Sequence, residues 1–516
     1  MKRLIIEFCF SLATVLAIAL SSATIAAAGP GTDTCAGSGA TIGGTCTPLT
    51  NTTSGDNLNT ALGAGALGSN ISGVDNTAIG ASALGSNTTG NNNTACGRNA
   101  LSSNIFGANN TASGVNALSR NTGGVQNTAS GFGALFSNTT GGANTASGNL
   151  ALVGNTTGDD NTANGINALL FNTTGNSNTA TGGEALQSNT TGNFNTASGI
   201  QALFSNTSGN ENTATGGAAL FSNTTGNFNT AAGNGALHGN TTGAFNTAAG
   251  ASALTLNTTG NQNTGVGQAA LHNNTSGQFN TAAGLNALAS NTDGNSNTAV
   301  GHGALRNSTT GSNNIALGVN AGFNSTTGSN NIDVGNPGVA AESATIRIGN
   351  QGTQTKTFLS GIFGSMVTGD AVVVSNTGQL GIVMSSARYK RDIRDMGNSS
   401  EALMKLRPVT FRYKDDPSGQ RQYGLVAEEV ARVYPDLVSR DAAGKVVSVH
   451  YHELVPMLLN EVLKQAEQIG SLNAQIAQDQ AQRASFEQHF SALEHKIEAK
   501  DANCSLAKAS PEPSLR

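Results

Sequence analysis

Residues 195–211 read NTASGIQALFSNTSGNE, and this phrase decides the fold because the chain repeats it. Between Asn59 and Asn330 the same 17-residue pattern, N-T-A-x-G-x-x-A-L-x-x-N-T-T-G-x-x, occurs sixteen times without an insertion or a deletion. A fixed period over such a length indicates one structural unit that stacks on copies of itself. We therefore predict that most of the molecule is a shaft.

Composition limits the class of protein. Among 516 residues there are 67 glycines, but glycine does not occupy every third position, which excludes collagen. An apolar Leu recurs from Leu67 to Leu305, which argues against disorder. The net charge of −5 gives no basic footprint, so we expect no nucleic-acid partner. Residues 385–516 carry eighteen acidic and eighteen basic side chains, whereas residues 29–338 carry nine acids and three arginines, so the chain has two dissimilar parts.

The repeat itself predicts a β-solenoid. Seventeen residues are too few for a βαβ unit, and the Gly and β-branched Thr content disfavours a helix. Asn-Thr-Thr-Gly is typical of a turn, and Thr-Ala-x-Gly and Ala-Leu are short runs that turn inward. One repeat per coil gives parallel strands about 4.8 Å apart, with like residues in ladders. We therefore predict a mainly β fold with a parallel β-solenoid shaft over residues 59–338.

The thin core of such a coil predicts a homotrimer. Two Ala, one Leu and one Thr per repeat provide too little apolar area for a monomer. Burial of the Leu column against two other copies of the chain would supply it. The repeats resemble the heads of trimeric autotransporter adhesins, which are left-handed β-rolls built from short repeats that end in an Ala-x-Gly phrase. The period is longer here than in that family.

Three repeated features leave alternatives open. The N-x-S/T triplets are either turn asparagines or glycosylation acceptors. Columns of Thr serve as turn and inward residues, or they order water on a flat face as in ice-binding proteins. A phenylalanine precedes the next repeat at four equivalent positions, where it either packs against neighbouring coils or chains or stacks on a sugar; these are Phe194, Phe228, Phe245 and Phe279. We expect no catalytic group, cofactor or metal in the shaft.

The N-terminus is typical of a secretory signal peptide over residues 1–28. Basic Lys2 and Arg3 precede an apolar stretch to about Leu20, and small residues end at Ala28, where we expect cleavage. An uncleaved anchor is the alternative. The pattern predicts export, with the protein secreted or held at the cell surface.

Residues 29–58 are predicted to form a cap or linker before the shaft. Cys35 and Cys46 bracket a Gly-rich loop there and are expected to form a disulfide outside the cytosol, with two free thiols as the alternative.

The pattern changes after the repeats. Residues 339–384 are predicted to form a β-rich neck, with β-type runs at 344–348 and 371–374 and a last hairpin closed at 378–381. A segment with ordinary globular composition opens at Ser385, and it contains a predicted strand at 406–413, a strand leading into a short helix at 423–430, and a strand at 446–451.

This segment resembles the intramolecular chaperone found at the end of phage endosialidases and tail spikes. The resemblance covers about residues 385–470 and rests on S-x-x-R-x-K from Ser385, LRPVTFRY, GLVAEEV and PDLV, in this order. We place a chaperone domain at residues 385–460. In that family the module trimerises the fibre and then cuts itself off, with the Ser of the motif as nucleophile and its Lys as base.

Carried over, the resemblance implies that Ser385 is the nucleophile and Lys390 the base of a serine endopeptidase that acts once, on its own chain. The severed bond is expected at or beside Ser385, whose neighbours are Met384 and Ser386. The family usually has Asp directly after the Ser, where this chain has Ser386, and this departure leaves cleavage open. The alternative is that Lys390 and Arg388 are surface charges that flank a linker.

The last segment predicts a coiled coil over residues 461–501. Apolar side chains recur at seven-residue spacing in two interleaved rows, with Gln465, Asp479 and Arg483 as polar interruptions. Residues 502–516 are predicted to be disordered. The cluster of His450, His452 and Glu453 lacks a further ligand at metal spacing and is expected to be structural.

Together these patterns predict an exported homotrimeric fibre for surface attachment, whose C-terminal chaperone drives trimerisation and releases itself. Its expected partners are copies of itself and a cell-surface or carbohydrate receptor. One alternative is a structural fibre in which no bond is cut. Another is a phage-derived tail fibre that binds a receptor, against which the signal peptide argues.

Overall fold

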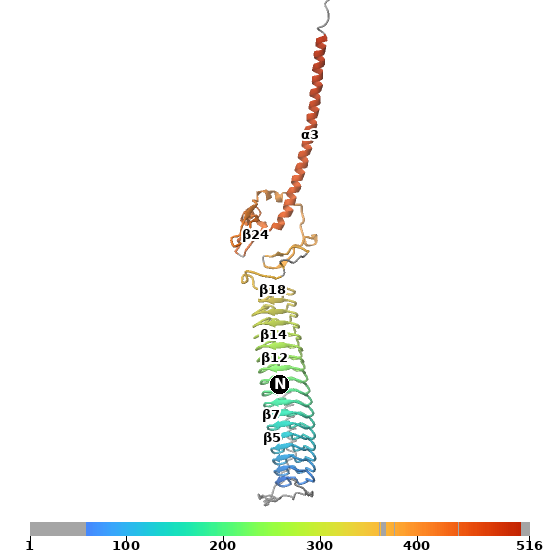
Figure 1. The fold of residues 1–516 in the computed structure, drawn as a ribbon, viewed down its shortest axis with the longest axis vertical. Coiled ribbons are helices and arrows are strands. Elements are labelled where there is room, and N and C mark those ends of the chain that lie inside the picture. Colours follow the sequence, from blue (N-terminus) through green and yellow to red (C-terminus); the bar gives the residue numbers. More distant parts are fainter. Residues whose placement is uncertain (1–57, 361, 363–367, 376, 442, 507–516) are drawn as a thin grey trace, which may run out of the picture. The chain divides into compact units, whose positions relative to one another are not determined.

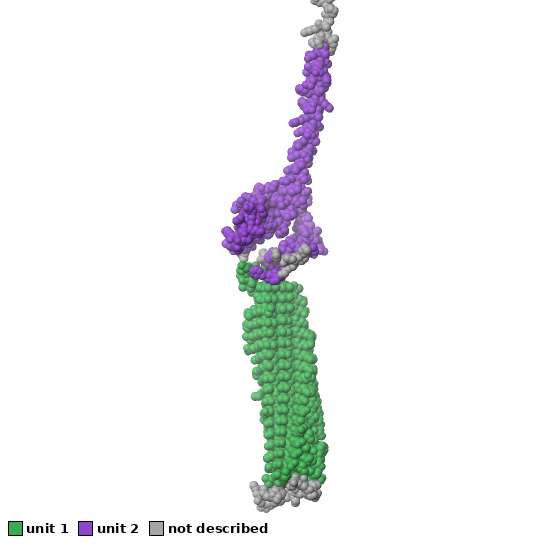
Figure 2. All heavy atoms as spheres, in the orientation of Figure 1, with its two compact units in different colours: residues 1–357 green, residues 358–516 purple. Residues whose placement is uncertain are grey.

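The computed structural model describes residues 58–360, 362, 368–375, 377–441 and 443–506. The predicted signal peptide and the expected Cys35–Cys46 disulfide lie outside these residues. The chain divides into two compact units, which meet in sequence between Thr357 and Phe358 (Figure 2). In the described part of the chain, no helix has the length and apolar character that a membrane span requires.

The first unit is a parallel β-solenoid, as predicted (Figure 1). Each coil contributes one three-residue strand to a single parallel sheet, and each strand pairs with its equivalents in the coils before and after it. The strands are β1 (Thr60–Leu62), β2 (Thr77–Ile79), β3 (Thr94–Cys96), β4 (Thr111–Ser113), β5 (Thr128–Ser130), β6 (Thr145–Ser147), β7 (Thr162–Asn164), β8 (Thr179–Thr181), β9 (Thr196–Ser198), β10 (Thr213–Thr215), β11 (Thr230–Ala232), β12 (Thr247–Ala249), β13 (Thr264–Val266), β14 (Thr281–Ala283), β15 (Thr298–Val300), β16 (Ile315–Leu317), β17 (Ile332–Val334) and β18 (Ile346–Ile348).

The core of the solenoid is complete within one chain. Ala197, Ala202 and Leu203 are fully buried, and so are their equivalents in the neighbouring coils. The expectation that the Leu column is buried against two other copies is therefore wrong. The Thr of the N-T-A phrase, such as Thr196, is exposed and not an inward residue.

Two columns of asparagine take the place expected for Thr. The Asn206 amide donates to the Asn189 Oδ1 at 2.8 Å and to the Gly209 carbonyl at 3.0 Å. The Asn195 amide donates to Asn178 Oδ1 at 3.1 Å and to the same Gly209 carbonyl at 2.8 Å. Both asparagines are fully buried. The repeat Asn are thus ladder residues of the core, and their hydrogen bonds satisfy polar groups that would otherwise be costly to bury.

Close stacking of the coils explains the repeat glycines. Gly199 has φ +138, and a Cβ added there would lie 2.6 Å from the carbonyl oxygen of Gly216. A Cβ at Gly209 would lie 2.4 Å from Asn206 Oδ1. At Gly199 both the positive φ and the close approach require glycine, whereas at Gly209 the close approach alone requires it. The Leu of the core column also lies in the left-handed region, as at Leu203 with φ 53.

The C-terminal end of the solenoid departs from the repeat. β18 pairs in parallel with β17, so the sheet continues into residues that the sequence assigned to the neck. In this register Ala316 lies beside Asp333 and Asp333 beside Arg347. Arg347 forms a bidentate ion pair with Glu342, at 2.7 Å. Charged residues thus replace the Ala column where the stack ends.

The second unit is smaller and contains both strands and helices. β19 (Val373–Val374) and β20 (Leu380–Gly381) form the predicted antiparallel hairpin. The remaining elements are η1 (Ala387–Tyr389), η2 (Gly397–Lys405), β21 (Val409–Phe411), β22 (Gln422–Gly424), α2 (Ala427–Val433), η3 (Pro435–Leu437), β23 (Val438–Arg440), β24 (Val446–Val449) and α3 (Tyr451–Leu506). A small core joins η2, α2, η3, β23, β24 and the start of α3; it contains Leu403, Val430, Leu437, Val438, Val449, Leu454 and Met457.

A long C-terminal helix was predicted over residues 461–501, and the observed helix α3 extends beyond both of these bounds. β24 ends at Val449, and α3 begins at Tyr451, inside the segment predicted as a strand. The helix continues past residue 501 to Leu506, so the predicted disorder is wrong for residues 502–506. Its early start lets the first turns contribute Leu454 and Met457 to the small core.

Candidate chaperone and self-cleavage site

Ser385 and Lys390 lie close together in the structure. The Lys390 Nζ is 3.4 Å from the Ser385 Oγ. The short helix η1 between them produces this approach, because the Tyr389 and Lys390 backbone amides donate to the carbonyls of Ser386 and Ala387. This turn brings a side chain five positions later back to the serine, which the spacing of the motif alone does not reveal.

The surroundings of this pair are open in the single chain. Met384, Ser385, Ser386 and Lys390 are all exposed. The Arg388 guanidinium lies over the Tyr389 ring, 4.9 Å from its centroid, and so points to a different neighbour. A lysine acts as a base only when it is neutral, and desolvation favours that form. An active dyad would therefore need further burial beyond what one chain provides.

The second and third phrases of the resemblance pack against each other. β21 and β22 pair antiparallel, with Thr410 opposite Tyr423. The Arg407 guanidinium reaches Glu429 on α2 with two hydrogen bonds, of 2.5 and 3.2 Å. This pair lowers the pKa of the Glu429 carboxyl and raises that of Arg407. The β21–β22 hairpin and α2 are thus held together by contacts between residues that are separate in the sequence.

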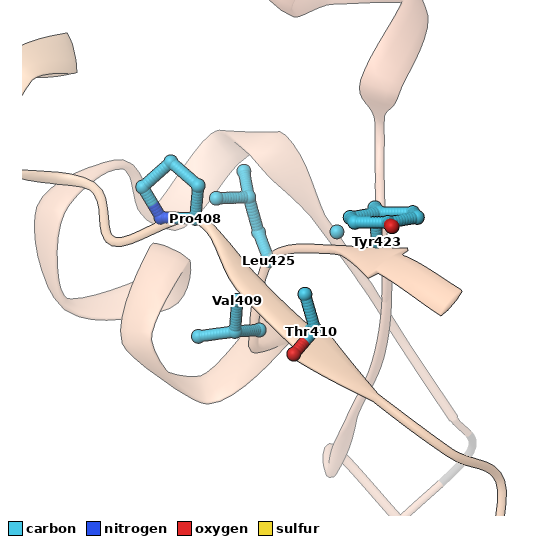
Figure 3. Close-up of a pocket in the computed structure, with 6 residues that line it drawn as sticks. Pro408, Val409, Thr410, Tyr423 and Leu425 are labelled. Carbon is cyan, nitrogen blue, oxygen red and sulfur yellow. The ribbon is translucent and has the colours of Figure 1, made fainter. Parts of the chain in front are cut away.

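An open pocket lies on this hairpin (Figure 3). It is lined by Pro408, Val409, Thr410, Tyr423, Gly424 and Leu425. The Tyr451 hydroxyl, at the start of α3, accepts a hydrogen bond of 2.8 Å from the backbone amide of Leu425 and thereby fixes one wall. Tyr423 is 78% exposed, so the hairpin presents an apolar surface to the outside. Sequence reasoning did not find this pocket, because its residues read only as strand.

The start of α3 is fixed to η2 by polar contacts. The Ser400 hydroxyl donates to Glu461 Oε1 at 2.6 Å, and the Asn460 amide donates to the Gly397 carbonyl at 2.9 Å. The Ser400 hydrogen bond, followed by Lys464, lowers the pKa of the Glu461 carboxyl. The helix therefore leaves the small core in a defined direction.

The histidines at the start of α3 contact one carboxylate. His450 Nδ1 and His452 Nε2 lie 3.3 and 3.7 Å from Glu453 Oε1. Within the described ranges, no three His, Cys, Asp or Glu side chains gather as a metal site would require.

The open alternatives in the shaft can be examined on the same structure. The Asn of the N-T-T turns at fully buried positions, such as Asn206, cannot accept a glycan. The Phe228 and Phe245 rings stack on each other with their centroids 4.8 Å apart, as packing between coils predicts. All four phenylalanines, Phe194, Phe228, Phe245 and Phe279, remain 45–63% exposed, so stacking on a sugar stays a prediction. The strand Thr face outward, as water ordering would require, and that alternative stays a prediction.

The comparisons with known proteins identify one segment of the chain. Residues 385–439 match the family described as the chaperone of endosialidase. The chain thus carries a C-terminal intramolecular chaperone of the endosialidase type in addition to its β-solenoid. The match begins at Ser385 and includes η1, β21, β22 and α2. It implies association of the chain with copies of itself, as in a trimeric tail-fibre-like protein. No curated protein and no solved structure matches the chain.

Proposed function

We propose that this protein is an exported homotrimeric fibre for surface attachment, and that its chaperone segment directs trimerisation and then detaches by self-cleavage at Ser385. The observation that carries the self-cleavage is the 3.4 Å approach of Lys390 Nζ to Ser385 Oγ at the start of the matched segment. The solenoid supplies the shaft. The N-terminal pattern of basic, apolar and small residues supports export.

The proposed reaction uses only groups of this chain and water. Neutral Lys390 takes the hydroxyl proton of Ser385 as its Oγ attacks the Met384 carbonyl carbon. The C–N bond of the Met384–Ser385 peptide then breaks, and the nitrogen receives the proton from Lys390. The resulting ester between the Met384 acyl group and the Ser385 Oγ is hydrolysed by water. The products are a C-terminal carboxylate at Met384 and a fragment that begins with a free amine at Ser385.

Trimerisation would switch this reaction on. Both side chains are exposed to water in one chain, whereas a Ser-Lys pair becomes reactive when its surroundings are desolvated. Contact with a neighbouring chain would remove that water and would also fix the geometry. Scission would then report completed assembly.

The competing proposal is a structural fibre that keeps its chaperone. The exposed dyad and the Ser386 in place of Asp favour it. For a receptor, the exposed side chains of the solenoid offer surface, and a cell-surface or carbohydrate target is the partner to test.

A denaturing gel of the purified protein separates these proposals. Wild type should give a large shaft and a fragment of about 130 residues, whereas Ser385→Ala and Lys390→Ala should stay intact. Arg388→Ala is the matched control, because its side chain contacts Tyr389 and not Ser385. Mass spectrometry of the fragment locates the cut. Intact wild type in assembled trimers would favour the structural fibre.

A further inference from the structure

α3 carries a long apolar seam that its own chain does not cover. Beyond the first turns, eight apolar side chains recur at alternating spacings of three, four or seven residues or their sums, and each is more than half exposed. They are Val462, Ile469, Leu472, Ile476, Phe486, Phe490, Leu493 and Ile497.

Two opposite charges interrupt the middle of this seam. Asp479 follows Ile476 by three residues and Arg483 precedes Phe486 by three, so both occupy seam positions. In the single chain, as far as the described residues go, they form no ion pair with each other, whereas other charges on this helix do pair, as Lys464 does with Glu461. Any partner that covers the apolar seam also buries these two charges.

Charge complementarity identifies the occupant. Burial of an unpaired charge is strongly unfavourable, so a partner of this seam must offer the opposite charge at the same level. A further copy of α3 does so, because it brings one acid and one base. The chaperone match already implies association of like chains, and three copies related by a three-fold axis are parallel.

The geometry of parallel helices brings the two charges together between chains. Asp479 and Arg483 are four residues apart, which is about 6 Å along a helix axis. Helical side chains lean toward the N-terminus, so a long Arg483 side chain reaches back toward the Asp479 level of its neighbour. Three acids and three bases then leave the buried layer neutral.

We propose that α3 docks on two further copies of itself in a parallel coiled coil, in which Asp479 of each chain forms an ion pair with Arg483 of a neighbouring chain. The proposal rests on the self-association in the proposed function and not on self-cleavage. It would also account for the two charges in an otherwise apolar seam.

The test uses full-length chains that carry Ser385→Ala, so that self-cleavage cannot affect the outcome. Asp479→Arg makes both positions basic, and Arg483→Asp makes both acidic. Each variant alone should lose the trimer in sedimentation equilibrium, or its helical signal at 222 nm should melt about 10 °C lower or more. Glu467→Arg, on the helix face opposite the seam, is the matched control and should behave like the parent.

Co-expression of the two single variants distinguishes an ion pair between chains from an ion pair within one chain. Chains with Asp479→Arg and chains with Arg483→Asp, each with its own affinity tag, should co-purify and melt at a higher temperature than either variant alone. A mixed trimer holds two chains of one variant and one of the other, so two of its three contacts between positions 479 and 483 join opposite charges, and these contacts lie between chains. Single variants that melt like the parent would overturn the proposal. So would a failure of the mixture to assemble, or a parent that is a dimer.

Discussion

The buried asparagines show how one residue type holds the shaft together. Asn206 receives a hydrogen bond from Asn223 and gives one to Asn189, so each amide links three consecutive coils. Its second hydrogen bond, to the Gly209 carbonyl, closes the turn of its own coil. Loss of one amide would leave several buried polar groups without partners, each of which costs about 1–3 kcal/mol.

The chain contains a natural interruption of this column, which yields a first prediction. Ser308 stands where an Asn is expected, and Asn291 Oδ1 and Ser308 Oγ have no hydrogen-bond partner. Ser308→Asn should restore the link and raise the free energy of unfolding by about 1 kcal/mol. Thermal melting would measure this. Ser222→Asn, outside the column, is the control, and an equal effect of both changes would contradict the explanation.

Asp333 yields a second prediction, on pH. Burial, and then the nearby Glu342, raise the pKa of the Asp333 carboxyl above its ordinary 3.8. An acid with a raised pKa contributes stability at low pH, which is lost as the pH rises through its folded-state pKa. Asp333→Asn should therefore slow hydrogen exchange of β17 and β18 at pH 7, and have a smaller effect below about pH 4.

The contribution of Glu342 to stability should depend on pH in the opposite direction from that of Asp333, so Glu342 serves as the internal comparison. The Arg347 hydrogen bond lowers the pKa of the Glu342 carboxyl, so its contribution is present at neutral pH and is lost as the pH falls through the lowered value. Glu342→Gln should therefore speed exchange of the same strands at pH 7. Equal changes in both variants would contradict this assignment.

At the scale of elements, the coil is the unit of the shaft. Every column repeats after 17 residues, as the register of β9 with β10 shows. Removal of residues 195–211 should therefore leave a shorter, folded solenoid with nearly unchanged melting, because β8 would then pair with β10 in the same register. Removal of residues 195–203 should break the columns and lower the melting temperature. Circular dichroism and small-angle scattering would measure both.

The sequence predicted the solenoid but not which side chains point inward. The period alone fixes the parallel stacking, and the Ala and Leu of each coil are buried as their apolar character requires. The strand Thr and the repeat Asn were assigned the wrong way round, because an isolated Asn-Thr-Thr-Gly phrase is typical of a turn. The amide becomes a good core group only when an identical amide lies one coil away, which a single repeat does not show.

The candidate site was predicted in part for a similar reason. The motif located Ser385 and Lys390, but their approach depends on the conformation of η1. The Arg407–Glu429 pair and the pocket beside it depend on the pairing of β21 with β22, which are ten residues apart in the sequence. The sequence of neither strand predicts which strand it pairs with.

For the whole molecule, the internal core changes the reason for trimerisation. The Leu column does not need other chains, so the grounds for a trimer are the chaperone match and the exposed seam of α3. A chain that lacks residues 385–516 should therefore show the circular dichroism of a β-fold but sediment as a monomer. A truncated chain that remains a trimer would place the association surface on the shaft.

The sameness of the coils carries a hazard for a folding chain. A strand that skips its neighbour and docks one repeat further along meets identical side chains, and the only penalty is an extruded loop of one repeat. Long arrays of interchangeable units therefore have many nearly equivalent misfolded arrangements. The end of the solenoid that contains Asp333, Glu342 and Arg347 is charged and not repeated, so β18 has a single correct partner strand, β17. If folding begins at this end, the register of each later coil is set by the coil already in place.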